Sequence, residues 1–256
     1  MALIFVPGIA VAGASYNLTF RDLSQPASEP QMSRHFVQDG KVRADLAENR
    51  VLIFTDQAMY VVDNKARTVH VEGNATRDQI IARIADQVRQ IRAKAATLTP
   101  DQRAKMEQGV SFLEDQTQTY KRTLPRDYVA TTRSEMIDGL ECRIWTQTRE
   151  GVKQLEICVV SASAVRGGDE ILAGMKMLGQ YPGFGSLQAL GVQLGDGDWW
   201  TGIEGLGGLP VLIRVFEHGH VAYEVTISGV HQGDLGESLF NIPDGYQQLG
   251  AGSAHF

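Results

Sequence analysis

The sequence predicts an α+β fold: a curved antiparallel sheet (an unclosed β-barrel) with a helical hairpin and a shorter helix packed on its concave face. Three observations predict it. Short segments in which apolar and polar residues alternate, separated by turn signals, fill residues 15–71, 128–160 and 211–227, as in antiparallel meanders. Two stretches with a 3.6-residue period lie within 76–117, and a third, glycine-containing helical stretch covers 168–181.

The first strands form a predicted meander. In residues 15–23, Tyr16, Leu18 and Phe20 alternate with polar residues, the period of a half-buried strand. Asp39-Gly40 lies between two further short runs and is a strong hairpin signal. We expect these further strands at 35–37, 41–46, 51–55, 58–62 and 68–71. Such a meander curves toward a sandwich or barrel.

Residues 76–117 predict a helical hairpin inserted into the β-protein. Thr76 and Thr99 each begin a capping box, and Pro100 occupies a first helical position, where its missing N–H costs nothing. Ile84 and Val88 belong to an apolar stripe that needs an apolar surface to cover. We therefore expect one β-rich domain over 15–250 with this insertion, followed by a tail at 251–256.

Cys142 and Cys158 are the only cysteines of the chain. They lie in two β-rich runs around a turn at residues 149–151, and counting outward from a three-residue loop that ends in glycine pairs one with the other. Directly opposed Cα atoms lie about 4.5–5.5 Å apart, which suits a disulfide. We predict that bond, and with it an oxidising compartment. The alternative is a pair of reduced, buried thiols.

Residues 1–14 predict a truncated signal peptide. A short apolar run ends in small-x-small triplets around Ala12 and Ala14, as at a signal-peptidase site. No lysine or arginine precedes Arg21, so the basic region is missing, and the alternative is a first β-strand. We expect cleavage after Ala12 or Ala14 and a periplasmic protein. No later segment is long and apolar enough for a transmembrane helix, and the net charge of −6 argues against nucleic acid as a partner.

Catalytic motifs fail their context tests. A nucleophile elbow requires a glycine two residues after its serine, and after Ser186 that position holds Gln188. The glycines of 202–208 are followed by a predicted strand, whereas a dinucleotide-binding loop leads into a helix. We therefore expect no enzymatic activity and no cofactor.

The C-terminal segment carries a resemblance to a known group. A strand opening at Leu209-Pro210-Val211, a strand at 223–227, and the ending LFNIPDGY at 239–246 resemble the C-terminal half of exported bacterial proteins of unknown function. Residues 36–71 are similar as well. The resemblance implies an unclosed antiparallel barrel like that of the periplasmic lipoprotein carriers (LolA/LolB-like), with helices in the concave face. The long hairpin at 76–117 departs from that pattern, and no catalytic residue can be carried over.

These observations predict a periplasmic, non-enzymatic binding protein for a lipid, an acyl chain or another hydrophobic ligand. Its helices would cover the apolar concavity, and two tryptophans would line its rim. The candidate ligand-binding residues are Ile171, Met175, Leu178, Trp199 and Trp200.

Two alternatives stay open. The chain could be a structural or adaptor protein of the envelope that docks a protein partner through its sheet edge or a helical face. More weakly, His218 and His220 with Met175 and Met177 could handle a metal. Two histidines on a turn do not make a site until a third ligand is shown, so we assign no metal ligand.

Overall fold

The computed structural model describes residues 12–25, 27–56, 58–73, 77–121, 128–178 and 203–249. Its contacts divide the chain into two compact units. The first unit comprises Met1–Gly73, Tyr128–Lys176 and Leu206–Phe256, and the second Asn74–Asp127 and Met177–Gly205. The first eleven residues of the predicted signal peptide and the predicted tail lie outside the described residues.

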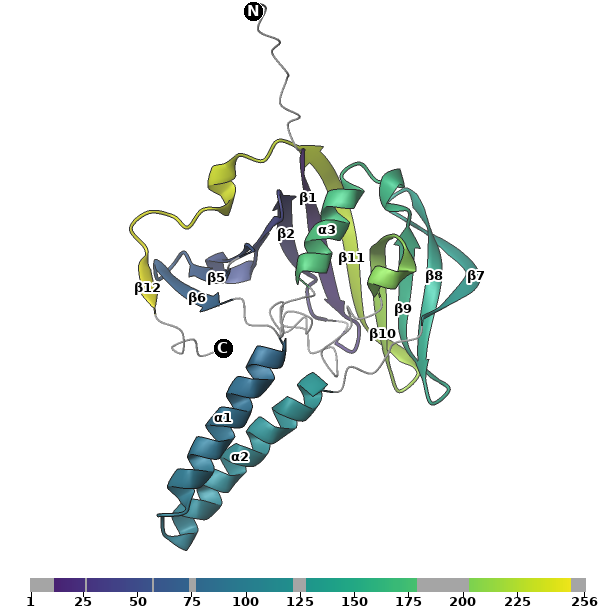
Figure 1. Ribbon diagram of the computed structural model, residues 1–256. Coiled ribbons are helices and arrows are strands. Elements are labelled where there is room, and N and C mark those ends of the chain that lie inside the picture. The colour runs from purple at the N-terminus through teal and green to yellow at the C-terminus, as the bar shows by residue number, and fades with distance from the viewer. Residues whose placement is uncertain are drawn as a thin grey trace, which may run out of the picture. The chain divides into compact units, whose positions relative to one another are not determined.

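Within the described residues, twelve strands form one curved, unclosed sheet (Figure 1). Its order is β12-β6-β5-β4-β3-β2-β1-β11-β10-β9-β8-β7. The strands of the N-terminal half are β1 (Gly13–Asp22), β2 (Gln31–Gln38), β3 (Lys41–Asp45), β4 (Arg50–Phe54), β5 (Ala58–Asp63) and β6 (Thr68–Gly73). Those of the C-terminal half are β7 (Tyr128–Ile137), β8 (Leu140–Arg149), β9 (Val152–Val160), β10 (Leu209–Glu217) and β11 (His220–Gly233), and β12 (Gln247–Leu249) pairs in parallel with β6. The predicted α+β fold with an unclosed barrel is confirmed.

The tight hairpins of the sheet share one turn chemistry. In each, a residue with positive φ precedes a glycine with positive φ: Asp39-Gly40, Asp138-Gly139, Glu150-Gly151 and His218-Gly219. Two positive φ angles define the type I′ turn, whose twist matches that of the strands it joins. The predicted turns at Asp39-Gly40 and His218-Gly219 are thereby confirmed. The predicted three-residue loop at 149–151 is wrong, because Arg149 still belongs to β8 and pairs with Val152.

Helix α3 (Gly168–Leu178) packs on one face of the sheet, which we call the α3 face. A Cβ added to Gly174 would lie 2.7 Å from a methyl of Val37 and 3.1 Å from one of Val42. Only glycine allows so close an approach of the helix backbone to β2 and β3. Val37 pairs with Ala14 across the β1–β2 ladder, so α3 contacts one rung of the sheet near its end.

A C-terminal segment covers the opposite face of the N-terminal half. We call residues 235–246 the strap and this face the strap face. Phe240 is buried, and with its neighbours it packs on an apolar cluster contributed by β2, β4, β5 and β6. The backbone of the strap is held by polar contacts: Leu235 N–H donates to Gln38, and Arg43 donates to the Leu239 carbonyl, both at 2.8 Å. The N-terminal half is therefore packed against apolar side chains on both faces.

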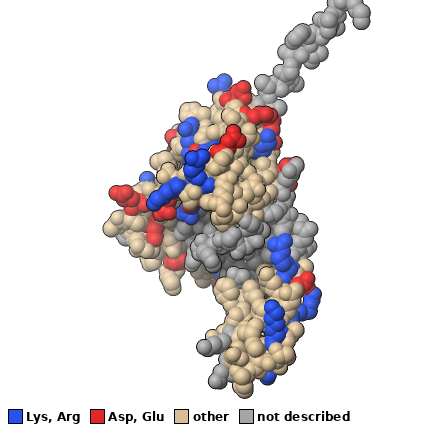
Figure 2. Space-filling view, turned by 90° about the vertical axis from the view of Figure 1, so that its left-hand side faces the viewer, with Lys and Arg blue, Asp and Glu red and all other residues tan. Residues whose placement is uncertain are grey.

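The second unit contains the predicted helical hairpin, α1 (Arg77–Ala95) and α2 (Pro100–Lys121). Ile84 and Val88 of α1 are buried against Val110 of α2, so the predicted apolar stripe forms the seam of the hairpin. Thr99 donates its N–H to the Gln102 side chain, as in the predicted capping box. The charged side chains of the hairpin that Figure 2 shows are mostly basic. Its packing on the concave face stays a prediction.

Candidate functional site

The predicted disulfide between Cys142 and Cys158 is confirmed. Its Cα atoms lie 5.3 Å apart, but the predicted register is wrong. Cys158 pairs with Ile144, not with Cys142. The turn has two residues instead of three, and the register shifts between Gln147 and Thr148. Both differences offset β9 along β8 from the predicted pairing. The cysteines are thus diagonal neighbours at the point where the β8–β9 ladder ends.

Beyond the disulfide, the β7–β8 hairpin curls over the strap face of the C-terminal half. Glu135 on β7 contacts Arg214 on β10 at 2.8 Å, although β8 and β9 lie between these strands in the sheet. At the turn of the hairpin, Asp138 accepts a hydrogen bond from the Gly229 N–H of β11 at 3.3 Å. Adjacent strands are about 4.8 Å apart, so a flat sheet would not bring these groups together.

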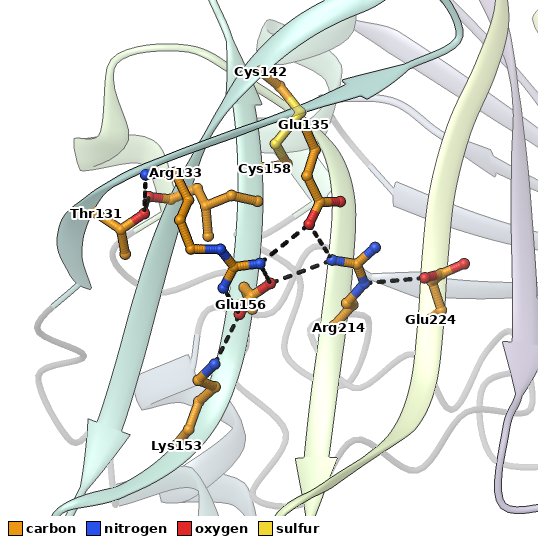
Figure 3. Close-up of polar contacts among 10 residues, drawn as sticks. Thr131, Arg133, Glu135, Cys142, Lys153, Glu156, Cys158, Arg214 and Glu224 are labelled. Atoms are coloured by element: carbon orange, nitrogen blue, oxygen red, sulfur yellow. Dashed lines mark hydrogen bonds and ion pairs between the residues drawn. A yellow bond between two sulfur atoms is a disulfide. The ribbon is translucent and has the colours of Figure 1, made fainter.

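An ionic network fills the space beneath this hairpin (Figure 3). At its centre Glu156 is 3% exposed and forms ion pairs with Lys153 at 2.9 Å, Arg133 at 3.2 Å and Arg214 at 3.3 Å. Glu135 and Glu224 bind Arg214 from either side. Three carboxylates therefore face three cations.

The electrostatics of the network follow from this pairing. Burial alone would raise the pKa of Glu156, but the hydrogen bond and charge of Lys153 and the charge of Arg133 bring it below its ordinary value. The hydrogen bond to Glu135 raises the pKa of Arg214, against the effect of burial. Since each of these charged groups has an oppositely charged partner, the network holds the hairpin against β9, β10 and β11.

A polar hollow of about 470 Å³ opens beside the hairpin. One wall is an irregular part of β7, where the register with β8 shifts between Ala130 and Ser134. The Thr131 hydroxyl donates to the Ile144 carbonyl at 2.9 Å, and Arg143 donates to the Thr131 carbonyl at 3.3 Å. The hollow is lined by residues 131–134, 141–143 and 159–161. Nothing in the sequence signalled it, because its walls come from three strands.

The predicted ligand-binding residues fall into two groups. Ile171, Met175 and Leu178 are buried on successive turns of α3, so the structure brings these three together along one side of the helix. Trp199 and Trp200 lie outside the described residues. Ligand binding by any of them stays a prediction.

The α3 face also contains a buried polar pair that sequence reasoning missed. Ser33 and His35 point to the same face of β2, and the Ser33 hydroxyl lies 2.9 Å from Nε2 of His35. Tyr16, the cross-strand partner of His35, stacks on the imidazole with ring centroids 4.9 Å apart. Within the described structure, Nδ1 of His35 is buried without a hydrogen-bond partner. The Ser-x-His spacing before Val37 was the feature of the sequence that could have revealed this pair.

Burial sets the protonation of this pair. It lowers the pKa of His35 to about 4, so the imidazole is neutral at pH 7. It also raises the pKa of Tyr16 above its ordinary value, which keeps the phenol neutral. The pair therefore offers hydrogen-bonding groups without charge.

In the described parts of the chain, no three His, Cys, Asp or Glu side chains gather closely enough to hold a metal ion. His218 and His220 are exposed at the β10–β11 turn. No helix among the described residues combines the length and apolar character needed to span a membrane.

No family model matches the sequence, and no curated protein matches it. The fold is similar to that of an uncharacterized conserved protein from Thermus thermophilus, with a TM-score of 0.45 and 7% identity over 94% of this chain and 91% of that one. PNGF-II is similar with a TM-score of 0.37 and 8% identity, over 93% of this chain and 31% of its own.

A third similarity is to MucB, solved in complex with MucA(peri). Its TM-score is 0.32, with 12% identity over 92% of this chain and 56% of MucB. A MucA/MucB complex from Pseudomonas aeruginosa is similar to the same extent, with a TM-score of 0.31. The curved, unclosed sheet agrees with the fold that the sequence resemblance implies, and no family is assigned.

Proposed function

We propose that this chain is an exported, periplasmic binding protein without enzymatic activity, which holds a lipid, an acyl chain or another hydrophobic ligand on its α3 face. The apolar character of that face supports the proposal. It continues from β4 across the centre of the sheet to β9, through Leu52, Val42, Phe20, Val225 and Ile157. An eleven-residue helix is only about 16 Å long, so α3 covers a few strands of it. These five side chains are already buried within the chain, so a hydrophobic ligand would replace part of what covers them now.

Export is supported by the disulfide, since such bonds persist in oxidising compartments and are rare in the cytosol. β1 begins at Gly13, and the second residue of the strand, Ala14, is buried and paired with both neighbouring strands. Of the two expected cleavage sites, the one after Ala12 leaves β1 intact.

The absence of enzymatic activity is proposed from the one hydroxyl–imidazole contact in the described structure. Ser33 and His35 are both buried, and among the described residues no carboxylate is hydrogen-bonded to the imidazole to orient it. A serine nucleophile needs a base that a third group orients, and among the described residues the His35 imidazole has no such group.

One observation favours the alternative, docking of a protein partner. β7 forms an edge of the sheet, and Val129 and Met136 on it are more than 60% exposed. An exposed edge strand with apolar side chains can take up an extended peptide as an additional strand.

Native mass spectrometry of protein purified from its own envelope tests the proposal. We expect adducts with the masses of lipids or acyl chains. The matched variants are Gly174→Ala, whose new methyl would press α3 off Val37, and Gly109→Ala on α2, where nothing lies within 4 Å. The first should lose the adducts and the second keep them. Protein free of any apolar adduct would refute ligand binding, and a co-purified polypeptide lost on Met136→Glu would favour the alternative.

A further inference from the structure

Ser33 and His35 form a polar pair within the apolar α3 face. The cross-strand neighbours of His35 are Tyr16 on β1 and Ala44 on β3, and neither carries a charge at neutral pH. Phenylalanine at this position would stack on Tyr16 and leave no polar atom. Histidine instead leaves Nδ1 buried and unpaired in the described structure, which is unfavourable and rare in folded proteins.

The pair can serve both kinds of hydrogen-bonding partner. In a neutral imidazole one nitrogen donates and the other accepts. When Nε2–H donates to the Ser33 hydroxyl, Nδ1 is an acceptor. When the hydroxyl donates to Nε2, Nδ1–H is a donor. The orientation of the Ser33 hydroxyl therefore decides whether Nδ1 accepts a hydrogen bond from a ligand hydroxyl or donates one to a ligand carbonyl.

We propose that Nδ1 of His35 is the hydrogen-bonding anchor for an uncharged polar head group of the hydrophobic ligand, such as the hydroxyl or ester carbonyl of an acylglycerol. This inference rests on the proposed function. An ionised carboxylate does not suit the site, because no cation among the described residues contacts the pair and an unpaired buried charge is strongly unfavourable.

The position of the pair relative to α3 fits this role. Val37, two residues after His35 on the same face, is the residue that Gly174 of α3 approaches. The imidazole thus lies one rung from the contact of the helix with the sheet. Because Nδ1 is buried, the cover on this face must move for a ligand to reach it, and we expect binding there to change the seating of α3.

The experiment compares two fluorescent probes, a pyrene-labelled monoacylglycerol and a pyrene-labelled fatty acid with the same chain. The variant is the double substitution Ser33→Ala/His35→Phe, which replaces both partners by apolar groups and keeps the ring on Tyr16. Replacing both members of a hydrogen-bonded pair is close to neutral for stability. We expect the wild-type protein to bind the monoacylglycerol more tightly, and the double variant to bind it at least tenfold more weakly with fatty-acid binding unchanged.

The outcomes separate the two proposals. If both proteins bind the monoacylglycerol equally, the anchor is refuted and the binding function stands. If the wild-type protein prefers the fatty acid, the uncharged head group is refuted. If it binds neither probe, the proposed function fails and the anchor with it. Imidazole ¹⁵N NMR of the wild-type protein needs no variant: monoacylglycerol should shift the Nδ1 resonance of His35, and an unchanged resonance at saturation would refute the contact.

Discussion

The two halves of the sheet are held by different kinds of interaction on the same face. On the N-terminal half, the strap buries Phe240 against apolar side chains of β2 and β4–β6. On the C-terminal half, the same face carries Glu156, Arg214 and their ionic partners beneath the β7–β8 hairpin. Apolar packing is non-directional and contains no charges for salt to screen, whereas ion pairs depend on pH and salt. The first half should therefore respond to loss of volume, and the second to solvent conditions.

The largest effect is expected in the N-terminal half. Phe240→Ala removes the buried aromatic ring of the strap and should lower the free energy of unfolding by about 3–5 kcal/mol, measured by urea denaturation. Hydrogen exchange should become faster in β12, which follows the strap and pairs with β6. The control is Phe112→Ala on α2, where the ring is 62% exposed and a change below about 0.5 kcal/mol is expected. Similar losses in both variants would contradict the packing of the strap.

His35 is the exception within the apolar half, because it makes that half sensitive to pH. Burial lowers its pKa to about 4 in the folded protein, against about 6.5 when unfolded. The unfolded chain therefore binds the proton first, and stability present above pH 6.5 is lost as the pH falls toward 4. The expected loss is about 3 kcal/mol.

Denaturation curves between pH 7 and 4 measure this loss. The double variant Ser33→Ala/His35→Phe should be nearly flat over that range. The pKa of Glu156 lies below the ordinary carboxyl value, so its contribution begins to be lost only below about pH 5, and the double variant, which keeps Glu156, shares that loss. A wild-type protein with constant stability from pH 7 to 4 would show that the imidazole is accessible to protons when folded.

In the C-terminal half, the disulfide is the strongest single constraint. Cys142→Ala/Cys158→Ala should lower the free energy of unfolding by about 2–3 kcal/mol, because the bond closes a short loop. Reduction of the wild-type protein should have the same effect. Peptide mapping without reductant should find the two cysteines linked in protein from the envelope. Two alkylatable thiols would instead contradict both the bond and the argument for export.

The smallest effect is expected for the ion pairs at the edge of the network. Arg133 is about half exposed, so solvent screens its pairs with Glu135 and Glu156. Arg133→Gln should cost under about 1 kcal/mol, and the difference from the wild-type protein should shrink further in 1 M salt. A loss that is larger and independent of salt would mean that Arg133 acts through packing.

Local patterns predicted most of the fold. The alternation around Tyr16, the Asp39-Gly40 turn and the capping box at Thr99 each specify an element through residues close in sequence, and each formed. The short parallel strand β12 was not expected, because Gln247–Leu249 has no alternating pattern and depends on the strap to bring it to β6.

The site was less predictable because its contacts are long-range. The disulfide was found, but its register was not, since the turn has two residues instead of three and the register shifts again between Gln147 and Thr148. Glu135 and Arg214 are far apart in sequence, and no local signal joins them. The sequence could not predict the unpaired nitrogen of His35, because its surroundings depend on β1, which places Tyr16 against the ring.

The central position of β1 constrains the order in which the chain can fold. β1 pairs with β2 on one side and with β11 on the other, so Phe20 meets Val225 after nearly all of the chain has been made. Pairing between such distant segments is slow, because the entropy of closing the loop must be overcome first. Strands β2–β6 and β7–β9 can each assemble from adjacent neighbours. Until β11 is available, however, one edge of β1 stays open to wrong partners.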